Sequence, residues 1–299
     1  MDTRQDSPWH DGERAIQRSI GAQERMEEIG RKVVRPYMPD QHRDFFAQLP
    51  FVVLGTVDDS GAPWATLRTG APGFMTSPES GTLRLALPAV PSDPAEAGLD
   101  DGAAVGLLGI ELHTRRRNRV NGNLRRMAPG AYSLTVGESF GNCPQYIHLR
   151  DFEWVEEAPG AVTELAALDD RALALIAHAG TFFVASHADG AAGRKVDVSH
   201  RGGPAGFVQV GADGVLTVPD YAGNRFFNTL GNMLLNGRAG LLFVDFEHGH
   251  LLQMTGEVEV VLDGAAAAGL AGAERLWRFR PRRIVWREKA IALRWCRRG

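Results

Sequence analysis

The 299-residue sequence contains only two cysteines, Cys143 and Cys296, and only three lysines. Two cysteines cannot make the disulfide framework of a secreted domain, and no CxxC or Cys/His cluster has the spacing of a metal site. There is also no apolar run long enough to span a bilayer, and the first residues are charged where a secretory signal would be apolar. We therefore expect a cytoplasmic protein without disulfides.

An excess of charge of one sign is also missing. The formal net charge is −3, with 33 lysines and arginines against 36 aspartates and glutamates, so no global field attracts nucleic acid or a membrane surface. Since three of the basic residues are lysines, the remaining thirty are arginines, which make forked contacts with phosphate and carboxylate. A genome rich in G and C produces the same bias, so the arginine excess alone does not identify a ligand.

Hydrophobic periodicity divides the chain into a helical start and a β-rich remainder. Residues 9–48 have apolar side chains spaced near 3.6 residues apart, which predicts a helical arm that Pro36 and Pro39 interrupt. From residue 51 onward, short apolar stretches are bounded by Gly, Pro and Asp, as is typical of strands joined by tight turns. The predicted fold class is mainly β with flanking helices and an N-terminal helical arm.

Three segments recur in the same order about 130 residues further along the chain. Residues 104–122 align without gaps onto residues 239–256 from Gly106 and Gly240 onward. The shorter segments are 68–74, which matches 201–207, and 49–61, which matches 181–193. Chance can produce one such match between apolar strands, whereas three in one order favour an internal duplication.

The duplication predicts two tandem β-barrels of ordinary domain size. The expected organisation is an N-terminal helical arm at 1–44, a first barrel at 45–155, a linker helix at 156–176 and a second barrel at 177–299.

The second half contains a pattern suited to a phosphate. Its loop DYAGNR precedes a predicted helix, FFNTLGNMLLNG, so that Asn224, Arg225 and Asn228 lie at a helix N-terminus. Free backbone N–H groups and the positive end of the helix dipole attract an anion there, and an arginine adds forked donors. Arg194 or Lys195 on the preceding strand supplies a second cation. The alternative is that Asn224 only caps the helix and Arg225 is solvated.

The first half lacks this phosphate pattern. It has Ala62 and Pro63 at the positions that match Arg194 and Lys195, and residues 88–101 form an acidic, proline-rich loop. We expect no phosphate to bind there.

The first half carries an arginine strand instead. The segment HTRRRNRVNG places Arg115, Arg117 and Arg119 on one face of a strand. These charges either meet a ligand or keep a solvated edge strand from aggregating.

Other chemical motifs are weaker. His248 and His250 fall on one face of a predicted strand beside Glu247, but no third ligand has useful spacing, so we predict no metal site. Cys143, between Asn142 and Pro144, is a candidate reactive thiol but is expected to be inert. The basic, tryptophan-containing residues 275–298 are compatible with nucleic-acid binding, but their alternation favours a final barrel strand.

Together these motifs resemble the FMN-binding split β-barrel of the pyridoxamine 5′-phosphate oxidase-like superfamily. The most specific segments are RKVDVSHRGGPAGFV and TVPDYAGNRFFNTLGNMLLNGRAGLLFVDFEHGHLLQMTGE, accompanied in the first half by ELHTRRRNRVNG and SFGNCPQYIHLR. The similarity covers most of residues 45–262 and is greatest to a bacterial flavin-nucleotide-binding branch of the superfamily.

The resemblance implies a set of FMN-binding residues distributed over both halves. These are Arg194, Lys195, Ser199, Asn224, Arg225, Asn228 and Gln253 in the second half, and Arg117 and Arg119 in the first. Two departures stand out, since Asn224 and Ser199 occupy places where the oxidase has cations. The C-terminal segment also lacks the oxidase's arginine and histidine pattern for substrate, so oxidation of pyridoxine phosphate is not expected.

Members of this family are usually homodimers with flavin in the groove between two barrels. The duplication then implies that the two split barrels of one chain form a pseudo-dimer, with FMN as cofactor. The expected function is an FMN-dependent oxidoreductase that acts on a small molecule or on NAD(P)H. The alternatives are a non-enzymatic flavin-binding or storage protein, and a haem-binding protein with His113, His200 or His248 as ligand. No nucleic-acid or membrane partner is expected, and pairing of whole chains into a homodimer stays open.

Overall fold

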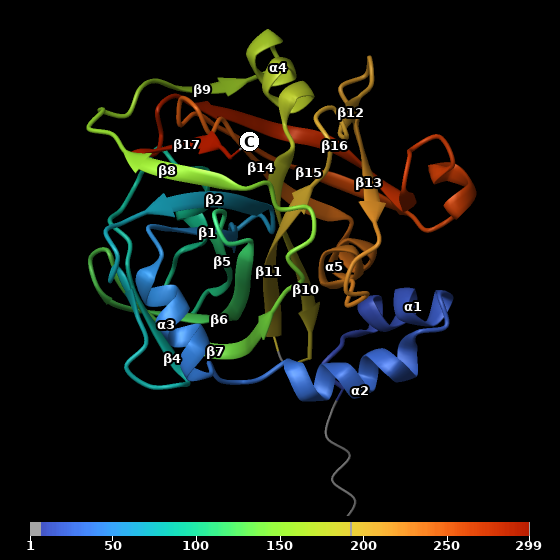
Figure 1. Ribbon diagram of the computed structural model, residues 1–299, viewed down its shortest axis with the longest axis horizontal. Helices are drawn as coiled ribbons and strands as arrows, with labels where there is room; N and C mark the ends of the chain where they lie inside the picture. The colour runs from blue at the N-terminus through green and yellow to red at the C-terminus, as the bar shows by residue number, and fades with distance from the viewer. Residues whose placement is uncertain (1–6, 192, 299) are drawn as a thin grey trace, which may run out of the picture.

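The computed structural model describes residues 7–191 and 193–298, which form two large antiparallel sheets with helices around them. The first sheet lies on the left of Figure 1 and the second on the right. Helices α1 (Asp11–Ser19) and α2 (Gln23–Val33) run below the second sheet, near α5 (Asn228–Asn236), whereas α3 (Asp40–Gln48) lies against the first sheet. The fold is therefore mainly β, with five α-helices among the described residues and a helical N-terminal region.

The first sheet has seven strands in the order β2-β1-β5-β6-β7-β4-β3. They are β1 (Phe51–Val57), β2 (Pro63–Thr69), β3 (Met75–Thr76), β4 (Thr82–Ala86), β5 (Ala104–Glu111), β6 (Arg116–Ala128) and β7 (Ala131–Gly141). Strand β1 is buried along its whole length, which agrees with its continuous apolar sequence FVVLGTV.

The second sheet repeats this order as β11-β10-β14-β15-β16-β13-β12. Its strands are β10 (Thr181–Gly190), β11 (Gly193–Gly202), β12 (Gln209–Val210), β13 (Leu216–Tyr221), β14 (Arg238–Val244), β15 (Leu251–Val261) and β16 (Ala273–Arg287), and β9 (Val162–Leu165) adds an edge beside β16. Each strand of the first sheet thus has a counterpart at the same place in the second.

The pairing register shows which residues are counterparts. Gly106 faces Asn121 across β5 and β6, and Gly240 faces Thr255 across β14 and β15, so these strands correspond at a shift of 134 residues. Arg68 faces Val52 and Arg201 faces Phe182, which makes Arg68 and Arg201 counterparts.

The alignment of residues 49–61 onto 181–193 was wrong by two positions. Val52 corresponds to Phe182 rather than to Val184. The β10–β11 hairpin is longer than the β1–β2 hairpin, so an ungapped alignment through the turn displaces the strand.

The two sheets contact each other reciprocally through a pair of counterpart glycines. A Cβ atom on Gly106 would lie 2.9 Å from the Cα of Asp197, and a Cβ atom on Gly240 would lie 2.8 Å from the Cα of Trp64. Asp197 and Trp64 are themselves counterparts on β11 and β2. Only glycine permits this close approach of backbone to backbone.

Three apolar clusters hold the structure together. One fills each half, around Phe46 in the first and Trp277 in the second. The third cluster includes Phe51 of the first sheet and Phe183 of the second, so it joins the sheets.

The predicted helical arm is three helices, α1 (Asp11–Ser19), α2 (Gln23–Val33) and α3 (Asp40–Gln48). Helix α3 covers the first core with Phe45 and Phe46. Helix α1 packs on α5 so tightly that a Cβ on Gly12 would meet the carbonyl of Gly231.

Two other expectations need correction. The predicted linker helix at 156–176 is strand β9 followed by α4 (Asp170–His178), because the apolar helical spacing begins only at the Asp169 cap. The C-terminal stretch makes β16 and then β17 (Leu293–Arg297), which pairs with β8 (Arg150–Trp154) in a small sheet of its own. None of the helices described is long and apolar enough to cross a membrane.

Candidate functional site

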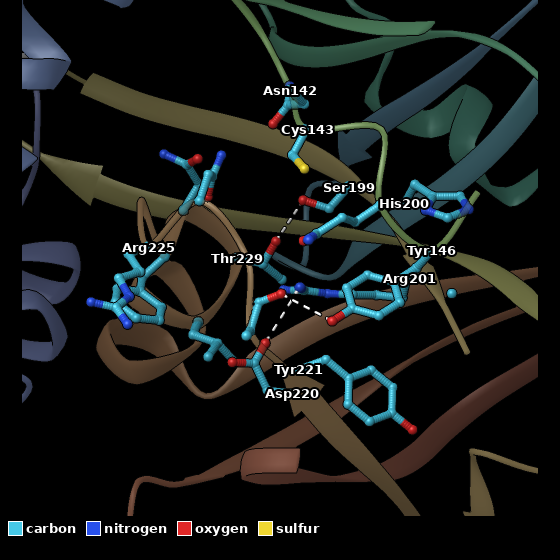
Figure 2. Close-up of a pocket in the computed structure, with 18 of the residues that line it drawn as sticks. Asn142, Cys143, Tyr146, Ser199, His200, Arg201, Asp220, Tyr221, Arg225 and Thr229 are labelled. Carbon is cyan, nitrogen blue, oxygen red and sulfur yellow. Dashed lines mark hydrogen bonds and ion pairs between the residues drawn. The ribbon is translucent and has the colours of Figure 1, made fainter. Parts of the chain in front are cut away.

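A pocket opens where the first half meets the second, and four arginines line it (Figure 2). We call it the arginine pocket. Its walls come from β6, the loop after β7, the end of β11, the loop after β13 and the first turn of α5. The lining polar residues are Arg117, Arg119, Asn142, Cys143, Gln145, Tyr146, Ser199, His200, Arg201, Asp220, Tyr221, Asn224, Arg225, Asn228 and Thr229.

Strand β6 brings Arg119 across to the second half. Alternation along the strand puts Arg119 on the same face as Arg117. The buried Arg119 lies 3.0 Å from Asp197 Oδ1, donates to Asn228 Oδ1 at 3.0 Å and donates to Ser199 Oγ. Ser199 Oγ also lies 2.7 Å from Thr229 Oγ1 on α5. Arg119 thus joins the two halves at the pocket.

Arg117 lies in the same pocket without a carboxylate partner among the described residues. Its Nη1 is 3.1 Å from His200 Nδ1. Burial, together with the positive charges of Arg119 and Arg201, lowers the pKa of Arg117 to about 10. The guanidinium remains charged at neutral pH and is poorly compensated.

His200 is held in one neutral form by this contact. A guanidinium can only donate, so His200 Nδ1 accepts and the proton lies on Nε2. Burial and the neighbouring cations hold the pKa of His200 well below its usual range. His200 Nε2 is buried and has no hydrogen-bond partner in the described structure. It is a donor in need of an acceptor.

The pocket carries an excess of positive charge. Arg117, Arg119, Arg201 and Arg225 line it, against the single lining carboxylate of Asp220, which pairs with Arg201 at 3.4 Å. Further buried donors lack a partner within the described residues, namely Arg117 Nε, Arg201 Nε and Asn142 Nδ2. Such a set of donors suits a ligand rich in acceptor oxygens.

The loop before α5 presents Arg225 to the pocket. Arg225 and Phe227 both have a backbone φ of 62°, and Asn224 Oδ1 accepts from the N–H of Phe226 at 3.1 Å. No side chain caps the N-terminus of α5. The exposed Arg225 side chain makes no hydrogen bond or ion pair with the part of the chain described, so its donors face the pocket and solvent.

Two tyrosines from different halves form an aromatic wall. Tyr146 and Tyr221 stack with ring centroids 5.4 Å apart, and the Tyr146 hydroxyl donates to the carbonyl of Ala222 at 3.1 Å. Figure 2 shows both rings beside Arg201 and Asp220. Gly202 is required here, because a Cβ would lie 2.1 Å from the Tyr146 carbonyl oxygen.

Six of the nine predicted cofactor-binding residues meet in the arginine pocket. They are Arg117, Arg119, Ser199, Asn224, Arg225 and Asn228. Arg115, expected on the same strand face as Arg117, is a turn residue with a φ of 61° before β6 begins.

The structure places Arg194, Lys195 and Gln253 elsewhere. Arg194 lies at the opposite end of β11, about 16 Å of strand from Ser199, and donates to Asp189 at 2.8 Å. Lys195 Nζ pairs with Glu138 at 2.6 Å. Gln253 is fully buried between the two sheets, where its Nε2 donates to the carbonyl of Ala65 at 3.0 Å. The strand motif does not tell which end of β11 lines the arginine pocket.

Several lining residues were missed by sequence reasoning. Arg201 could have been identified from the sequence, because the repeated segments RTGAPGF and RGGPAGF share their first arginine. Tyr146 lies in the SFGNCPQY loop that the resemblance singled out, but its stacking on Tyr221 depends on contact between the halves.

The three candidate haem ligands lie far apart. His200 lines the arginine pocket, while His113 lies beside Phe152. His248 lies in the exposed turn after β14 rather than on a strand. There Asp245, His248 and His250 offer ligand atoms within 4.8 Å of one another, a third ligand that residue spacing did not reveal.

Helix α1 places a buried carboxyl group against Asn228, one of the residues that line the pocket. Glu13 accepts from the N–H of His10 at 2.8 Å and from Asn228 Nδ2. Burial raises the pKa of Glu13 to about 8, so the group is mostly protonated at neutral pH. No residue pattern in the arm indicated this role.

Comparison with known proteins agrees with the resemblance in the first half. Residues 38–166 match the family model described as pyridoxamine 5′-phosphate oxidase. No curated protein matches the chain.

The solved structures that match this chain are distant in sequence. HupZ of Group A Streptococcus is 14% identical, covering 35% of this chain and 93% of its own, with a TM-score of 0.28. HutZ, the haem storage protein of Vibrio cholerae, is 14% identical over 42% of this chain and 93% of its own, with a TM-score of 0.25. The Bacillus subtilis inhibitor of motility MotI/DgrA is 11% identical over 81% and 88%, with a TM-score of 0.22. On the family match, residues 38–166 form a pyridoxamine 5′-phosphate oxidase-like split-barrel domain.

Proposed function

We propose that the arginine pocket binds FMN and that the protein is an FMN-dependent oxidoreductase acting on a small molecule or NAD(P)H. In this proposal the two halves are split barrels that imitate a homodimer within one chain. The observation that carries it is the convergence of four arginines and several unpartnered donors from both halves on one pocket.

The phosphate of FMN fits the side of the pocket formed by the loop before α5. Arg225 supplies a forked donor that has no other described partner, and the uncapped first turn of α5 adds backbone N–H groups. The hydroxyls of Ser199 and Thr229 lie at the inner end of this surface. Asn224 shapes the loop through its bond to the Phe226 N–H, so the capping reading of Asn224 is compatible with phosphate binding.

The ring system of FMN fits the remainder of the pocket. Arg117, Arg201 and Asn142 hold unpartnered donors for the ring carbonyl oxygens. A bound flavin would supply hydride or electron transfer, and a cation beside it favours its anionic reduced form. Arg117 is suited to that role because it is half-buried and has no carboxylate partner among the described residues. The Tyr146 and Tyr221 rings would cover the ligand and exclude water at the mouth.

The state of His200 favours flavin over haem in this pocket. An imidazole ligand to iron needs a free nitrogen lone pair, but His200 Nδ1 already accepts from Arg117. The protonated Nε2 instead suits a hydrogen bond to an acceptor oxygen. A non-enzymatic flavin carrier would use the same pocket, so reactivity must separate carrier from enzyme.

The test begins with a fluorescence titration of FMN into the purified chain. We expect Arg225→Ala to weaken FMN binding about 10- to 100-fold, the range of one or two lost charge-assisted hydrogen bonds. Arg194→Ala is the matched control, since it removes an arginine from the same half outside the pocket. Equal affinities of the two variants would contradict the assignment.

Anaerobic addition of NADH or NADPH to the FMN-loaded protein then separates the enzyme from the carrier. Bleaching of the flavin absorbance supports the oxidoreductase. A flavin that neither nicotinamide nor any candidate substrate reduces supports the carrier.

A further inference from the structure

The first half contains a carboxylate, Asp93, that is buried among donors from both halves. Asp93 Oδ2 lies 3.2 Å from Arg68 Nε and 3.0 Å from Arg287 Nη1, and Thr66 Oγ1 donates to the same oxygen. Gln253 Nε2 donates to Asp93 Oδ1 at 2.9 Å. The Asp93 side chain is entirely inaccessible to solvent. We call this cluster the Asp93 site.

The Asp93 site occupies the place in the first half that the arginine pocket occupies in the second. The strand registers make four pairs of counterparts, in which the residue of the Asp93 site is named first: Thr66 and Ser199, Arg68 and Arg201, Gln253 and Arg119, Arg287 and Asn142. At the Asp93 site, β2 of the first sheet meets β15 of the second. At the arginine pocket, β11 of the second sheet meets β6 of the first. The two sites are therefore related by the same reciprocity as Gly106 and Gly240.

The connections that close the two sites differ. In the second half, the segment between β13 and β14 forms α5 and leaves the pocket open beside Ser199. In the first half, the segment between β4 and β5 instead enters the site with Asp93, whose second oxygen also accepts from the N–H of Ala95 at 3.0 Å. The counterpart hydroxyls therefore have different partners: Ser199 bonds Thr229, whereas Thr66 bonds Asp93.

Charge is balanced at the Asp93 site. Arg68 and Arg287 meet the carboxylates of Asp93 and Glu96, the latter accepting from Arg68. Two buried guanidinium groups that converge on one point require an anion, because leaving buried charges uncompensated is strongly destabilising. Asp93 of the same chain supplies that anion.

We propose that the first half retains an oxyanion-binding site and that Asp93 fills it as an internal anion. Removal of that carboxylate would then create a site for a small carboxylate or phosphate oxyanion. The consequence that only the arginine pocket is left for a flavin rests on the proposed function, whereas the oxyanion site itself does not.

The test is chemical rescue of Asp93→Ala by formate. Formate restores the carboxylate that this substitution removes, without its link to the chain. We expect the variant to melt well below the wild type in sodium chloride, and sodium formate at equal ionic strength to raise its melting temperature by about 2–4 °C.

Two controls make the result specific. Leu83→Ala removes a fully buried side chain from the first core and destabilises the same half without creating a charged cavity. Asp93→Asn removes the charge but leaves the cavity filled. Neither of these variants nor the wild type should gain stability from formate relative to chloride.

Formate that stabilises Leu83→Ala as much as Asp93→Ala overturns the proposal, as does an Asp93→Ala variant that is as stable as the wild type. If Asp93→Ala does not fold in chloride, recovery of folded protein in formate supports the proposal and failure in both salts overturns it. Rescue by inorganic phosphate as well as formate extends the site to phosphate, and rescue by formate alone restricts it to carboxylates. The FMN titration of the wild type tests the proposed function separately.

Discussion

The arginine pocket and the Asp93 site are counterparts in one duplicated fold, yet only one of them is open. In the Asp93 site, Arg68 and Arg287 are neutralised by Asp93 and Glu96. In the arginine pocket, Arg117 has no carboxylate partner among the described residues and Arg225 faces solvent. The comparison teaches that duplicated strands preserve a place for an anion, while the connecting segments decide whether the chain or a ligand fills it.

The largest expected effect comes from giving the pocket the residue of its counterpart. Arg119→Gln places the equivalent of Gln253 in the second half and leaves the buried Asp197 without its cation. We expect a loss of about 3–5 kcal/mol in the free energy of unfolding, measured by urea unfolding. Arg117→Gln is the control, since its removal leaves no carboxylate of the described residues without a partner. Similar losses in both variants would show that the Arg119–Asp197 pair does not join the halves.

The next effect tests the reciprocal contact between the sheets. Gly240→Ala and Gly106→Ala each force a methyl group against the backbone of the opposite sheet. We expect each to cost about 1–3 kcal/mol, with the greater cost at Gly240, where the nearest atom is the Pro63 carbonyl oxygen at 2.3 Å. Thermal unfolding measures this, and Gly81→Ala is the control because no atom lies within 4 Å of its Cβ. A loss of stability in only one of the two glycine variants would show that the two contacts between the sheets are not equivalent.

A smaller, pH-dependent effect tests the contact of α1 with the arginine pocket, where Glu13 accepts a hydrogen bond from the lining residue Asn228. Glu13 titrates near its ordinary value when unfolded, but its pKa is about 8 in the fold, so the folded state binds the extra proton between these values. Stability therefore falls as pH rises through this window, by at most about 1.4 kcal/mol per pH unit. Glu13→Gln should remove this loss and unfold at higher urea than the wild type above pH 8.

The measurement for Glu13 is urea unfolding between pH 7 and pH 9. In this range the buried His42 and His187, whose pKa values burial lowers to about 4, are already neutral and contribute no slope. Glu24→Gln, on the exposed face of α2, provides the control. An unchanged slope in Glu13→Gln would mean that Glu13 is ionised in the folded protein.

Features encoded by local patterns were predictable from the sequence. The duplication followed from apolar strands in one order, and the matching strand order of the two sheets agrees with it. Arg117, Arg119 and the loop at Asn224 were identified because alternation and a helix start are read over a few residues.

Features that depend on contact between distant segments were not predictable. The ends of β11 look alike in sequence, so Arg194 was chosen although only the Ser199 end lines the arginine pocket. The acidic loop was expected to repel phosphate, but the insertion of Asp93 between Arg68 and Arg287 requires three separate segments to meet. Glu13 likewise becomes significant only when α1 lies on α5.

The most direct test of the comparison is the stoichiometry of FMN binding to the wild-type chain by isothermal titration calorimetry. The account predicts one FMN per chain, bound in the arginine pocket, because the Asp93 carboxylate fills the counterpart place. Two FMN molecules per chain would contradict the closure of the Asp93 site, and no binding would contradict the proposed function.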